Sequence, residues 1–217
     1  MIYVIKHKPG NVPLLSGYQE LGVGSCFEQD KSFDNIEHLN PYINELTAVY
    51  WLWQNCNDDI VGVHHYHRYF ADMNKYIPWS TAEICAKKYD IVLTKPLEFD
   101  ISLLEWFTQH DFPKWLPEFN KYYSMFLDKE PEFDNYLQGK TTNARNMFIA
   151  RKEIMDRFCE WLFPIVIPIA EQFVIEDANR YEDMMYQRMI GYISERLLPY
   201  WVHKERLNYL ELPIIEF

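Results

Sequence analysis

The 217-residue sequence lacks the features that mark secreted, membrane-spanning and nucleic-acid-coating proteins. Its four cysteines (Cys26, Cys56, Cys85 and Cys159) are widely separated and form no CxxC pair, which predicts free thiols in a reducing compartment. No signal-peptide pattern follows Met1, and no uninterrupted apolar run reaches the length of a membrane span. We therefore expect a cytoplasmic protein.

The net charge of -11 argues against a protein that binds along the phosphates of nucleic acid, because such binding needs clustered lysine and arginine. It leaves room for a small anionic ligand held by one or two local cations. Several catalytic motifs are also absent: HExxH, GxGxxG, GxxxxGK[ST] and GxSxG. A zinc peptidase, a Rossmann dehydrogenase, a P-loop kinase and a serine hydrolase therefore lack their usual sequence support.

Short β-branched runs alternate along the chain with segments of helical periodicity. The runs at residues 2–6, 60–63, 90–94 and 146–150 predict strands. Helical spacing predicts helices over residues 40–53, from 80 onward, a pair over 112–136, one over 152–163 and a strong one over 181–198. Residues 11–39 are weakly patterned and predict a long loop. This alternation is typical of an α/β fold, with a mostly parallel sheet flanked by helices.

Several local signals mark where these helices begin and end. Asn40 followed by Pro41 is typical of a helix start. Capping boxes are expected at residues 80–83 and 102–105. Pro164 is expected to kink or end the helix that begins at residue 152.

Polar residues follow three of the predicted strands. They are His7 and Lys8, residues 64–68, and Thr94 and Lys95. In open α/β sheets ligands bind beyond the carboxyl ends of the strands. The sequence therefore predicts an anion or nucleotide site at that edge.

Residues 64–69, which read HHYHRY, are the most unusual segment. If the strand continues through them, His65 and His67 share one face, and with a carboxylate they could hold a metal ion. Alternatively, Arg68 and a protonated histidine could neutralise phosphates. A third interpretation is purely structural, with these side chains satisfied by neighbouring carbonyl groups.

The last predicted helix carries Arg188, Glu195 and Arg196. Arg188 and Glu195 are seven residues apart and so fall on one helix face. Glu195 could act as a general base if that face lines a cleft, or it could form an ordinary surface ion pair. Glu45 is ambiguous in the same way.

Two segments resemble the signature of one bacterial family. Residues 40–53 read NPYINELTAVYWLW and residues 59–70 read DIVGVHHYHRYF. The family's usual pattern is NPYxxELTAxYWxWKN followed by DxVGLCHYRRYF. Weaker matches at residues 2–9, 146–149, 159–163 and 191–198 extend the resemblance over nearly the whole chain in the right order. The family, long described as a domain of unknown function, is regarded as glycosyltransferases of capsular or exopolysaccharide synthesis.

The resemblance implies a GT-A-like, Rossmann-like fold in one domain over residues 1–217. Residues 1–150 would form the nucleotide-sugar-binding α/β part, and residues 151–217 a mainly helical part. It also implies transfer of a sugar from a nucleotide donor, UDP-linked in our interpretation, to a saccharide that is usually lipid-linked, in capsular, exopolysaccharide or O-antigen synthesis. Peripheral membrane contact through an apolar edge is one expectation for the tail, and packing back onto the body is the other. The residues concerned are Trp201, Leu207, Tyr209, Leu210, Ile214 and Ile215.

One departure concerns the metal. In the GT-A-like fold the strand corresponding to residues 60–63 normally ends in an Asp-x-Asp pair that holds Mn²⁺ against the donor diphosphate. His65, Tyr66 and His67 stand there in this chain. The family pattern has cysteine at position 64 and arginine at 67, where this chain has histidine at both. A divalent metal (Mn²⁺ or Mg²⁺) on His65 and His67 is thus conceivable but not implied by the family.

These considerations assign provisional roles. Arg68 and His65 are expected to stabilise the departing diphosphate. Glu195 is expected to accept the acceptor proton if the reaction inverts the anomeric centre, with Asp183 and Glu45 as the next choices. The expected donor-binding residues are His7, Lys8, Tyr66, His67, Lys95, Arg188 and Arg196. Two other interpretations remain: a non-catalytic nucleotide-sugar-binding protein, and a metallohydrolase with histidine ligands.

Overall fold

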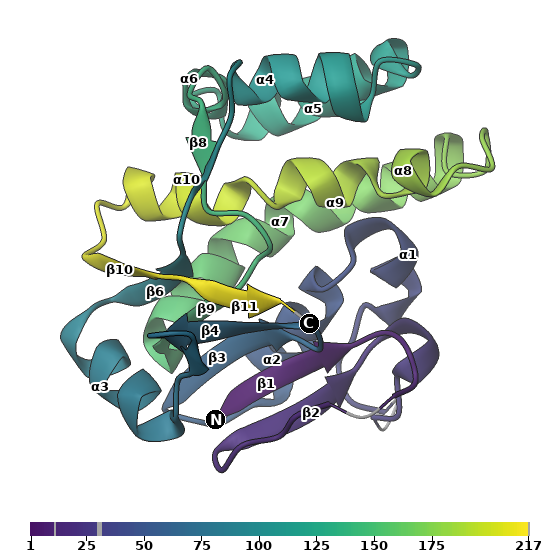
Figure 1. Cartoon of the computed structure of the whole chain (residues 1–217). Helices are drawn as coiled ribbons and strands as arrows, with labels where there is room; N and C mark the ends of the chain where they lie inside the picture. Colours follow the sequence, from purple (N-terminus) through teal and green to yellow (C-terminus); the bar gives the residue numbers. More distant parts are fainter. Residues whose placement is uncertain (11, 30–31, 217) are drawn as a thin grey trace.

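The computed structural model describes residues 1–10, 12–29 and 32–216. A mixed sheet forms the lower part of the molecule, and helices stand above it in two further tiers (Figure 1). The main sheet contains β1 (Ile2–Lys6), β2 (Tyr18–Gly22), β3 (Ile60–His65), β4 (Arg68–Asp72), β5 (Lys75–Tyr76), β6 (Ile91–Thr94), β9 (Phe148–Arg151), β10 (Tyr209–Leu212) and β11 (Ile214–Glu216). A separate two-stranded ribbon pairs β7 (Leu97–Glu98) with β8 (Thr141–Thr142).

The strands of the main sheet run in the order β10-β6-β9-β3-β1-β2. Among these six strands all except β9 point the same way, because β1 is parallel to β2 and β3, β10 is parallel to β6, and β9 is antiparallel to both of its neighbours. Strand β4, which lies off this path, is also antiparallel to β3. The predicted α/β fold with a mostly parallel sheet is therefore confirmed. The direction of β9 differs from a strictly parallel arrangement, because apolar periodicity carries no information about strand direction.

The two faces of the sheet alternate residue by residue, as the pleat requires. Along β1, Tyr3 and Ile5 pack on the side of α2 (Leu46–Asn55) and α7 (Lys152–Glu176), whereas Ile2 and Val4 pack on the side of α3 (Trp79–Lys88). All six residues of β3 are buried. Full burial of an aliphatic side chain contributes roughly 1.5–3 kcal/mol, so this central strand anchors the fold.

The remaining helices are all shorter than α7. They are α1 (Asn40–Ile43), α4 (Leu103–Trp106), α5 (Leu116–Lys129), α6 (Phe133–Leu137), α8 (Met184–Gln187), α9 (Met189–Ser194) and α10 (Leu197–Lys204). One-turn 3₁₀ segments are η1 (Gly24–Cys26) and η2 (Glu37–Leu39), and η3 (Phe107–Asp111) is a π-turn. Helices α8 to α10 lie between the sheet and the uppermost tier of α4, α5 and α6 (Figure 1).

Helix α7 corrects one expectation. It runs unbroken for 25 residues through Pro164 and Pro168. Both prolines are exposed, so the carbonyls that lose an N–H partner can bond to water. By length and composition α7 could cross a membrane, but half of its apolar window is buried within the protein. It packs against β3, β9, α2 and α5, as a core helix does.

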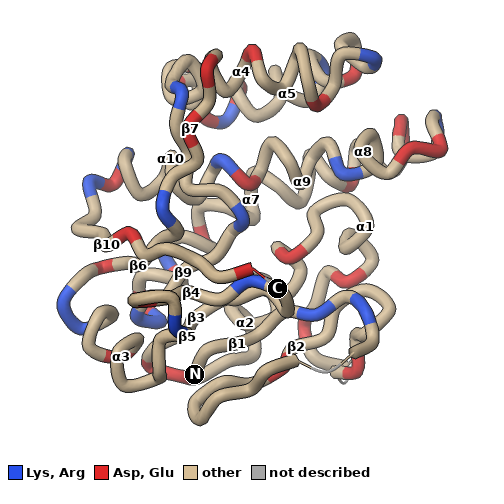
Figure 2. Tube along the Cα trace, viewed as in Figure 1, with Lys and Arg blue, Asp and Glu red and all other residues tan. Residues whose placement is uncertain are grey.

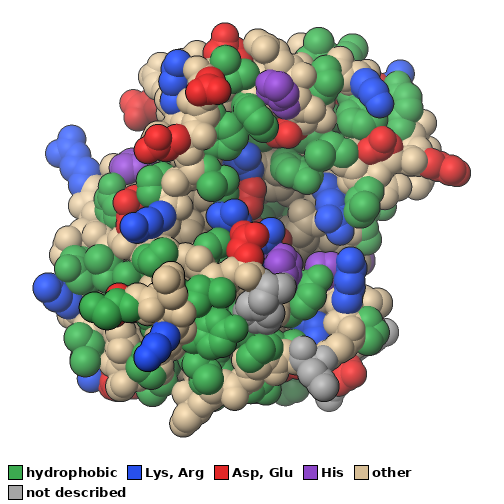
Figure 3. Space-filling model, in the orientation of Figure 1, with side chains coloured by type: hydrophobic (Ala, Val, Ile, Leu, Met, Phe, Trp, Pro, Cys, Tyr) green, Lys and Arg blue, Asp and Glu red, His purple; other side chains and the backbone are tan. Residues whose placement is uncertain are grey.

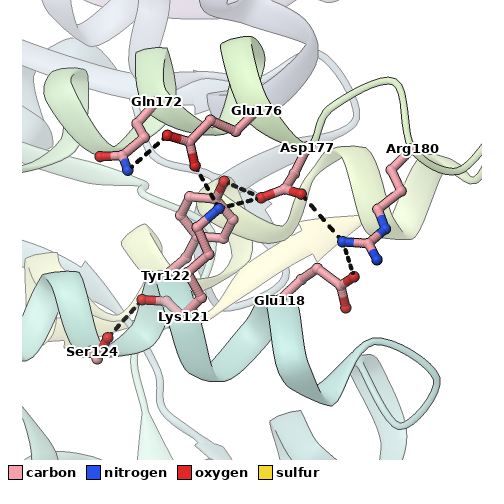
Figure 4. Close-up of polar contacts among 8 residues, drawn as sticks. All are labelled: Glu118, Lys121, Tyr122, Ser124, Gln172, Glu176, Asp177 and Arg180. Carbon is pink, nitrogen blue, oxygen red and sulfur yellow. Dashed lines mark hydrogen bonds and ion pairs between the residues drawn. The ribbon is translucent and has the colours of Figure 1, made fainter.

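A polar network fixes the end of α7 to α5 (Figure 4). The Asp177 carboxylate is almost buried, and it accepts hydrogen bonds of 2.5 Å from Lys121 Nζ and from the Tyr122 hydroxyl. Arg180 bridges Asp177 to Glu118 of α5, with an Nη1–Oε1 distance of 2.9 Å to Glu118. These bonds hold the pKa of Asp177 below its usual value despite its burial. The upper helical tier is thereby attached to the core helix.

Two predicted helices are interrupted, and both breaks matter for the site. The helix expected over residues 40–53 is split into α1 and α2, because Asn44 adopts φ 52° and ψ -129°. The helix expected over 181–198 is divided into α8, α9 and α10, with breaks at Arg188 and at residues 195–196. The capping box at Ser102 and Glu105 is confirmed. The one expected at residue 80 is not, because α3 begins at Trp79 behind Pro78.

The part of the chain expected to be mainly helical, residues 151–217, carries α7, α8, α9 and α10. It also includes two strands that the sequence did not predict, β10 and β11. Trp201 is 2% exposed, and Leu207 and Tyr209 pack partly buried against the core. The tail therefore packs back onto the body. Strand β2 was missed within the predicted loop over 11–39 because its sequence, YQELG, carries little β-branched character.

Candidate active site

A cleft of about 440 Å³ opens at the carboxyl edge of β1 and β3 and is roofed by α1 and α9. The volume is within the range of small-molecule sites. In Figure 3 the hollow lies between the α/β body and the helices above it, and histidine, basic and acidic side chains gather around it. Its walls are formed by Ile5, His7, Val23, Gly24, Ser25, Asn40, Pro41, Asn44, Glu45, His65, Tyr66, His67, Arg68, Arg188, Gly191, Tyr192 and Glu195.

The parallel pairing of β1 with β3 builds the floor of the cleft. Ile5 lies opposite His65 in the register, so the ends of the two strands bring His7 and residues 65–67 to the same cleft. The His7 and Tyr66 rings meet edge-on with centroids 5.2 Å apart. Ser25, which follows β2, donates a hydrogen bond to the His7 carbonyl at 2.9 Å. Two of the three polar clusters expected at strand ends therefore meet.

The expected continuation of the strand beyond His65 is wrong. Tyr66 and His67 form a tight turn, and the chain returns as β4 with Arg68 paired opposite His65. The alternation of faces proposed for residues 64–68 therefore does not apply. The turn instead brings His65, Tyr66, His67 and Arg68 together on the cleft wall.

Burial decides the charge state of the two strand histidines. His65 is 9% exposed, and desolvation, aided by the nearby Arg68 charge, lowers its pKa to about 3. It is thus neutral at physiological pH, and the expected role as a protonated phosphate ligand is corrected to that of a neutral imidazole. His64 is fully buried among Tyr18, Tyr69 and Phe70, and its pKa also falls to about 3 by desolvation. It does not line the cleft.

The structure gives little support to a metal centre at His65 and His67. Their ring centroids are 6.2 Å apart. Within the part of the chain that the structure describes, no three His, Cys, Asp or Glu side chains gather closely enough to hold a metal ion. The protein groups present therefore do not fit a resident Mn²⁺ or Mg²⁺, and metal binding by these two histidines stays a prediction without a third ligand.

Arg68 provides the fixed positive charge at the cleft wall. Its Nε donates to Glu216 Oε1 at 2.8 Å, and the same oxygen lies 3.1 Å from Nη2 of Arg145. The Arg68 hydrogen bond is the main reason why the pKa of Glu216 is below its usual value. Both signs of charge meet where β11 pairs with β4 (Figure 2). Glu216 thus acts as an internal anion for two arginines.

Arg188 and Glu195 flank α9 at its two ends and line the opposite wall of the cleft, so the predicted pair shares the cleft although the predicted helix is broken at both residues. Gly191, between them, permits close approach of α1, because a Cβ there would lie 2.7 Å from Asn44 Nδ2. Both Glu195 oxygens are engaged. Oε1 accepts from the Arg145 backbone N–H at 2.5 Å, and Oε2 pairs with Arg196.

Arg196 itself faces away from the cleft. It is 6% exposed, and its guanidinium stacks over the Phe107 ring at 5.0 Å. The expectation that Arg196 binds the donor is therefore corrected. Arg196 pairs with Glu195 on the side of that carboxylate away from the cleft. Asp183 is also engaged structurally, since its side chain caps α8 by accepting from the Met185 and Tyr186 backbone N–H groups.

Glu45 lies at the break between α1 and α2 and faces into the cleft. Its Oε1 accepts a hydrogen bond of 2.9 Å from Asn146 Nδ2. Burial raises its pKa, and Asn146 and the charges of Arg188 and Arg68 oppose that rise. No other side chain in the described residues hydrogen-bonds to its second oxygen. A carboxylate of this kind can accept a proton near neutral pH.

Besides Arg196, two other expected donor-binding residues lie outside the cleft lining. Lys8 lies close enough for its charge to lower the pKa of His7 and His67, but it does not line the cleft. Lys95 is exposed at the end of β6 and separated from β3 by β9. Sequence reasoning missed Asn146, Arg145 and Glu216 as site residues. No local signal could have identified them, because their partners are 50 to 148 residues away in the sequence.

The fold and the family are supported by comparison with known proteins. No curated protein matches the chain. Among solved structures, the apo structure of WbbM, a bifunctional glycosyltransferase, matches with a TM-score of 0.78 at 24% identity. The match covers 99% of this chain and 45% of WbbM, so the chain spans less than half the length of that protein. At this level of identity the similarity shows a shared fold.

The sequence model of one family covers residues 1–206, and this extent exceeds nine-tenths of the chain. That family is described as a domain of unknown function, DUF4422. The cleft, the sheet and the helices that roof it all lie within or directly beside the matched residues. The chain therefore belongs to the DUF4422 family.

Proposed function

We propose that this protein is a glycosyltransferase that moves a sugar from a nucleotide-sugar donor, UDP-linked in the first instance, to a saccharide acceptor in bacterial surface polysaccharide synthesis. The observation that carries the proposal is the meeting of Arg68, Arg188 and Glu45 in one cleft at the carboxyl edge of parallel strands. The fold shared with WbbM and the family resemblance support it. A lipid-linked acceptor at the cytoplasmic face of the membrane is part of this proposal.

The chemistry requires two kinds of group. An acceptor hydroxyl oxygen attacks the anomeric carbon, and the bond from that carbon to the diphosphate breaks, leaving its electron pair on the diphosphate. Arg68 and Arg188 are positioned cations that stabilise this growing charge. His65, which is neutral, can donate or accept one hydrogen bond but adds no charge.

The acceptor proton needs a base in an inverting transfer. Glu195 was the first expectation, but both of its oxygens are already bonded. Glu45 suits the role better, because one oxygen is held by Asn146 while the other has no side-chain donor in the described residues. We therefore assign proton acceptance to Glu45. No step in this scheme uses a metal ion.

The first experiment is a thermal-shift screen against nucleotides and nucleotide sugars, with and without Mn²⁺. A ligand present at 100 times its dissociation constant stabilises the folded state by about 2.7 kcal/mol. Donors that bind are then tested for slow hydrolysis and for transfer. Absence of any shift together with absence of hydrolysis for all donors would reject the proposal, while binding without turnover would favour a non-catalytic member.

A variant pair locates the chemistry. Arg68→Ala is expected to lower turnover with the best donor by about a hundredfold or more, the size seen when one charge-stabilising group is lost. Arg157→Ala removes the same charge outside the cleft lining, where Arg157 pairs with Glu205, and should leave turnover unchanged. Near-normal turnover in Arg68→Ala would remove Arg68 from the site.

A further inference from the structure

The short segment at residues 143–146, between β8 and β9, connects the inner edge of the cleft to several elements. Asn143 Nδ2 donates to the Thr94 carbonyl at 2.6 Å and to Glu211 Oε1 at 2.9 Å. The Thr94 hydroxyl donates to the Ala144 carbonyl at 3.2 Å. These bonds attach the start of the segment to the ends of β6 and β10.

The second half of the segment reaches the two carboxylates of the cleft. The Arg145 backbone N–H donates to Glu195, and Asn146 Nδ2 donates to Glu45. Consecutive residues thus hold two carboxylates from different parts of the chain, Glu195 at the end of α9 and Glu45 at the break between α1 and α2. This segment is the direct link between them.

The backbone is strained to make this link. Arg145 has φ 84° and Asn146 has φ 49°, both in the left-handed region. Such conformations cost of order 1 kcal/mol or more for a residue with a Cβ, although asparagine tolerates them better than most. Two strained residues in succession persist only where surrounding contacts fix them. Here those contacts are the bonds to Glu195 and Glu45.

The side chain of Asn146 has one effective orientation. It is 3% exposed, and its amide must direct Nδ2 toward Glu45, because the reverse orientation would set its carbonyl oxygen against the carboxylate. Its donor also favours the charged form of Glu45 over the neutral form. The other charged and titratable groups lining the cleft around Glu45 are Arg68, Arg188, Glu195, His7, His65, His67, Tyr66 and Tyr192.

We propose that Asn146 is a positioning residue that holds one oxygen of Glu45 so that the other faces the acceptor hydroxyl. This inference rests on the proposed function, in which Glu45 accepts the proton. Asn146 acts on Glu45 alone and does not touch the substrate. Its second effect is to favour the ionised form of Glu45, in opposition to the burial of the carboxylate.

The test titrates Glu45 directly. Protein labelled with ¹³C at the glutamate carboxyl carbon is followed by NMR against pH, and the Glu45 signal is identified by its loss in Glu45→Gln. Asn146→Gly removes the donor, and glycine accepts a positive φ without strain. A hydrogen bond to a charged group is worth about 1.5–3 kcal/mol, so the pKa of Glu45 should rise by about one unit or more in this variant.

Activity gives the second readout. In Asn146→Gly the acid limb of the pH profile of kcat/KM should move to higher pH by the same number of pH units as the pKa of Glu45 measured by NMR, and kcat should fall. Asn146→Asp keeps the shape but replaces the donor with a carboxylate, so it should shift the limb further. Asn143→Ala serves as the matched control, since it loosens the same segment without touching Glu45 and should leave the limb in place.

The outcomes separate this inference from the proposed function. An unchanged Glu45 titration in Asn146→Gly, with the fold intact by thermal melting, overturns it whether or not any activity is found. A shifted titration with full transfer activity in Glu45→Gln also overturns it, because Glu45 would then have no proton to accept. A matching shift in titration and acid limb, absent in Asn143→Ala, supports it.

Discussion

Acid should destabilise this protein through its two buried strand histidines. His64 is fully enclosed by Tyr18, Tyr69 and Phe70, and neither ring nitrogen has a hydrogen-bond partner among the described residues. His65 is 9% exposed. Burial lowers the pKa of each from 6.5 to about 3. In the unfolded chain both would titrate at the ordinary value.

The sign follows from proton binding. Between pH 6.5 and pH 3 the unfolded state carries protons on these histidines and the folded state does not, so stability falls as pH falls through that window. At about 1.4 kcal/mol per pH unit, each histidine should cost about 2 kcal/mol between pH 7 and pH 5, and the pair about 4 kcal/mol. Stabilities of 5–15 kcal/mol are typical of domains, so the effect is large.

The assay is urea unfolding followed by tryptophan fluorescence from pH 8 to pH 5. Carboxylates such as Glu37 and Asp111, whose pKa values burial raises, act in the opposite direction, and a variant comparison cancels them. His64→Cys, which carries the residue usual in the family pattern, should lose about half of the pH dependence, or about 2 kcal/mol over the same interval. His38→Gln removes an exposed histidine and should change nothing. The reasoning would be refuted if the free energy of unfolding of the wild type did not change from pH 7 to pH 5. It would also be refuted if the free energy of unfolding of His64→Cys depended on pH as steeply as that of the wild type.

Two further outcomes test the cleft itself. Glu216→Gln removes the negative charge that pairs with Arg68 and Arg145, so UDP should bind more tightly when measured by calorimetry. The gain should be at most about fivefold, because the carboxylate is half exposed. Glu83→Gln is the control, and unchanged affinity in Glu216→Gln would mean that this pair does not contact the ligand. Gly191→Ala places a Cβ within 3 Å of Asn44 and of the Tyr42 carbonyl, so α1 and α9 must separate, and urea unfolding should show a loss of about 1–3 kcal/mol. Full stability in that variant would mean that the two helices are not closely packed there.

The sequence by itself determined the elements whose signals are local. The buried run at residues 60–63, the strands near residues 2, 91 and 148, and the helix that begins at residue 152 follow from β-branched runs and apolar periodicity. Their alternation implies parallel strands, and parallel strands bring the polar residues that follow them to one edge. For β1 and β3 this holds, and His7 and His65 line the same cleft, whereas β9 runs in the opposite direction.

Only the tertiary structure decided what the site residues can do. The bond of Asn146 to Glu45 spans 101 residues and that of Arg68 to Glu216 spans 148, and no local pattern encodes such partners. The breaks at Asn44 and Arg188, inside sequences with good helical periodicity, arise because packing between α1 and α9 overrides local preference. The neutral state of His65 depends on burial, a property of the assembled sheet and helices rather than of the segment that carries it.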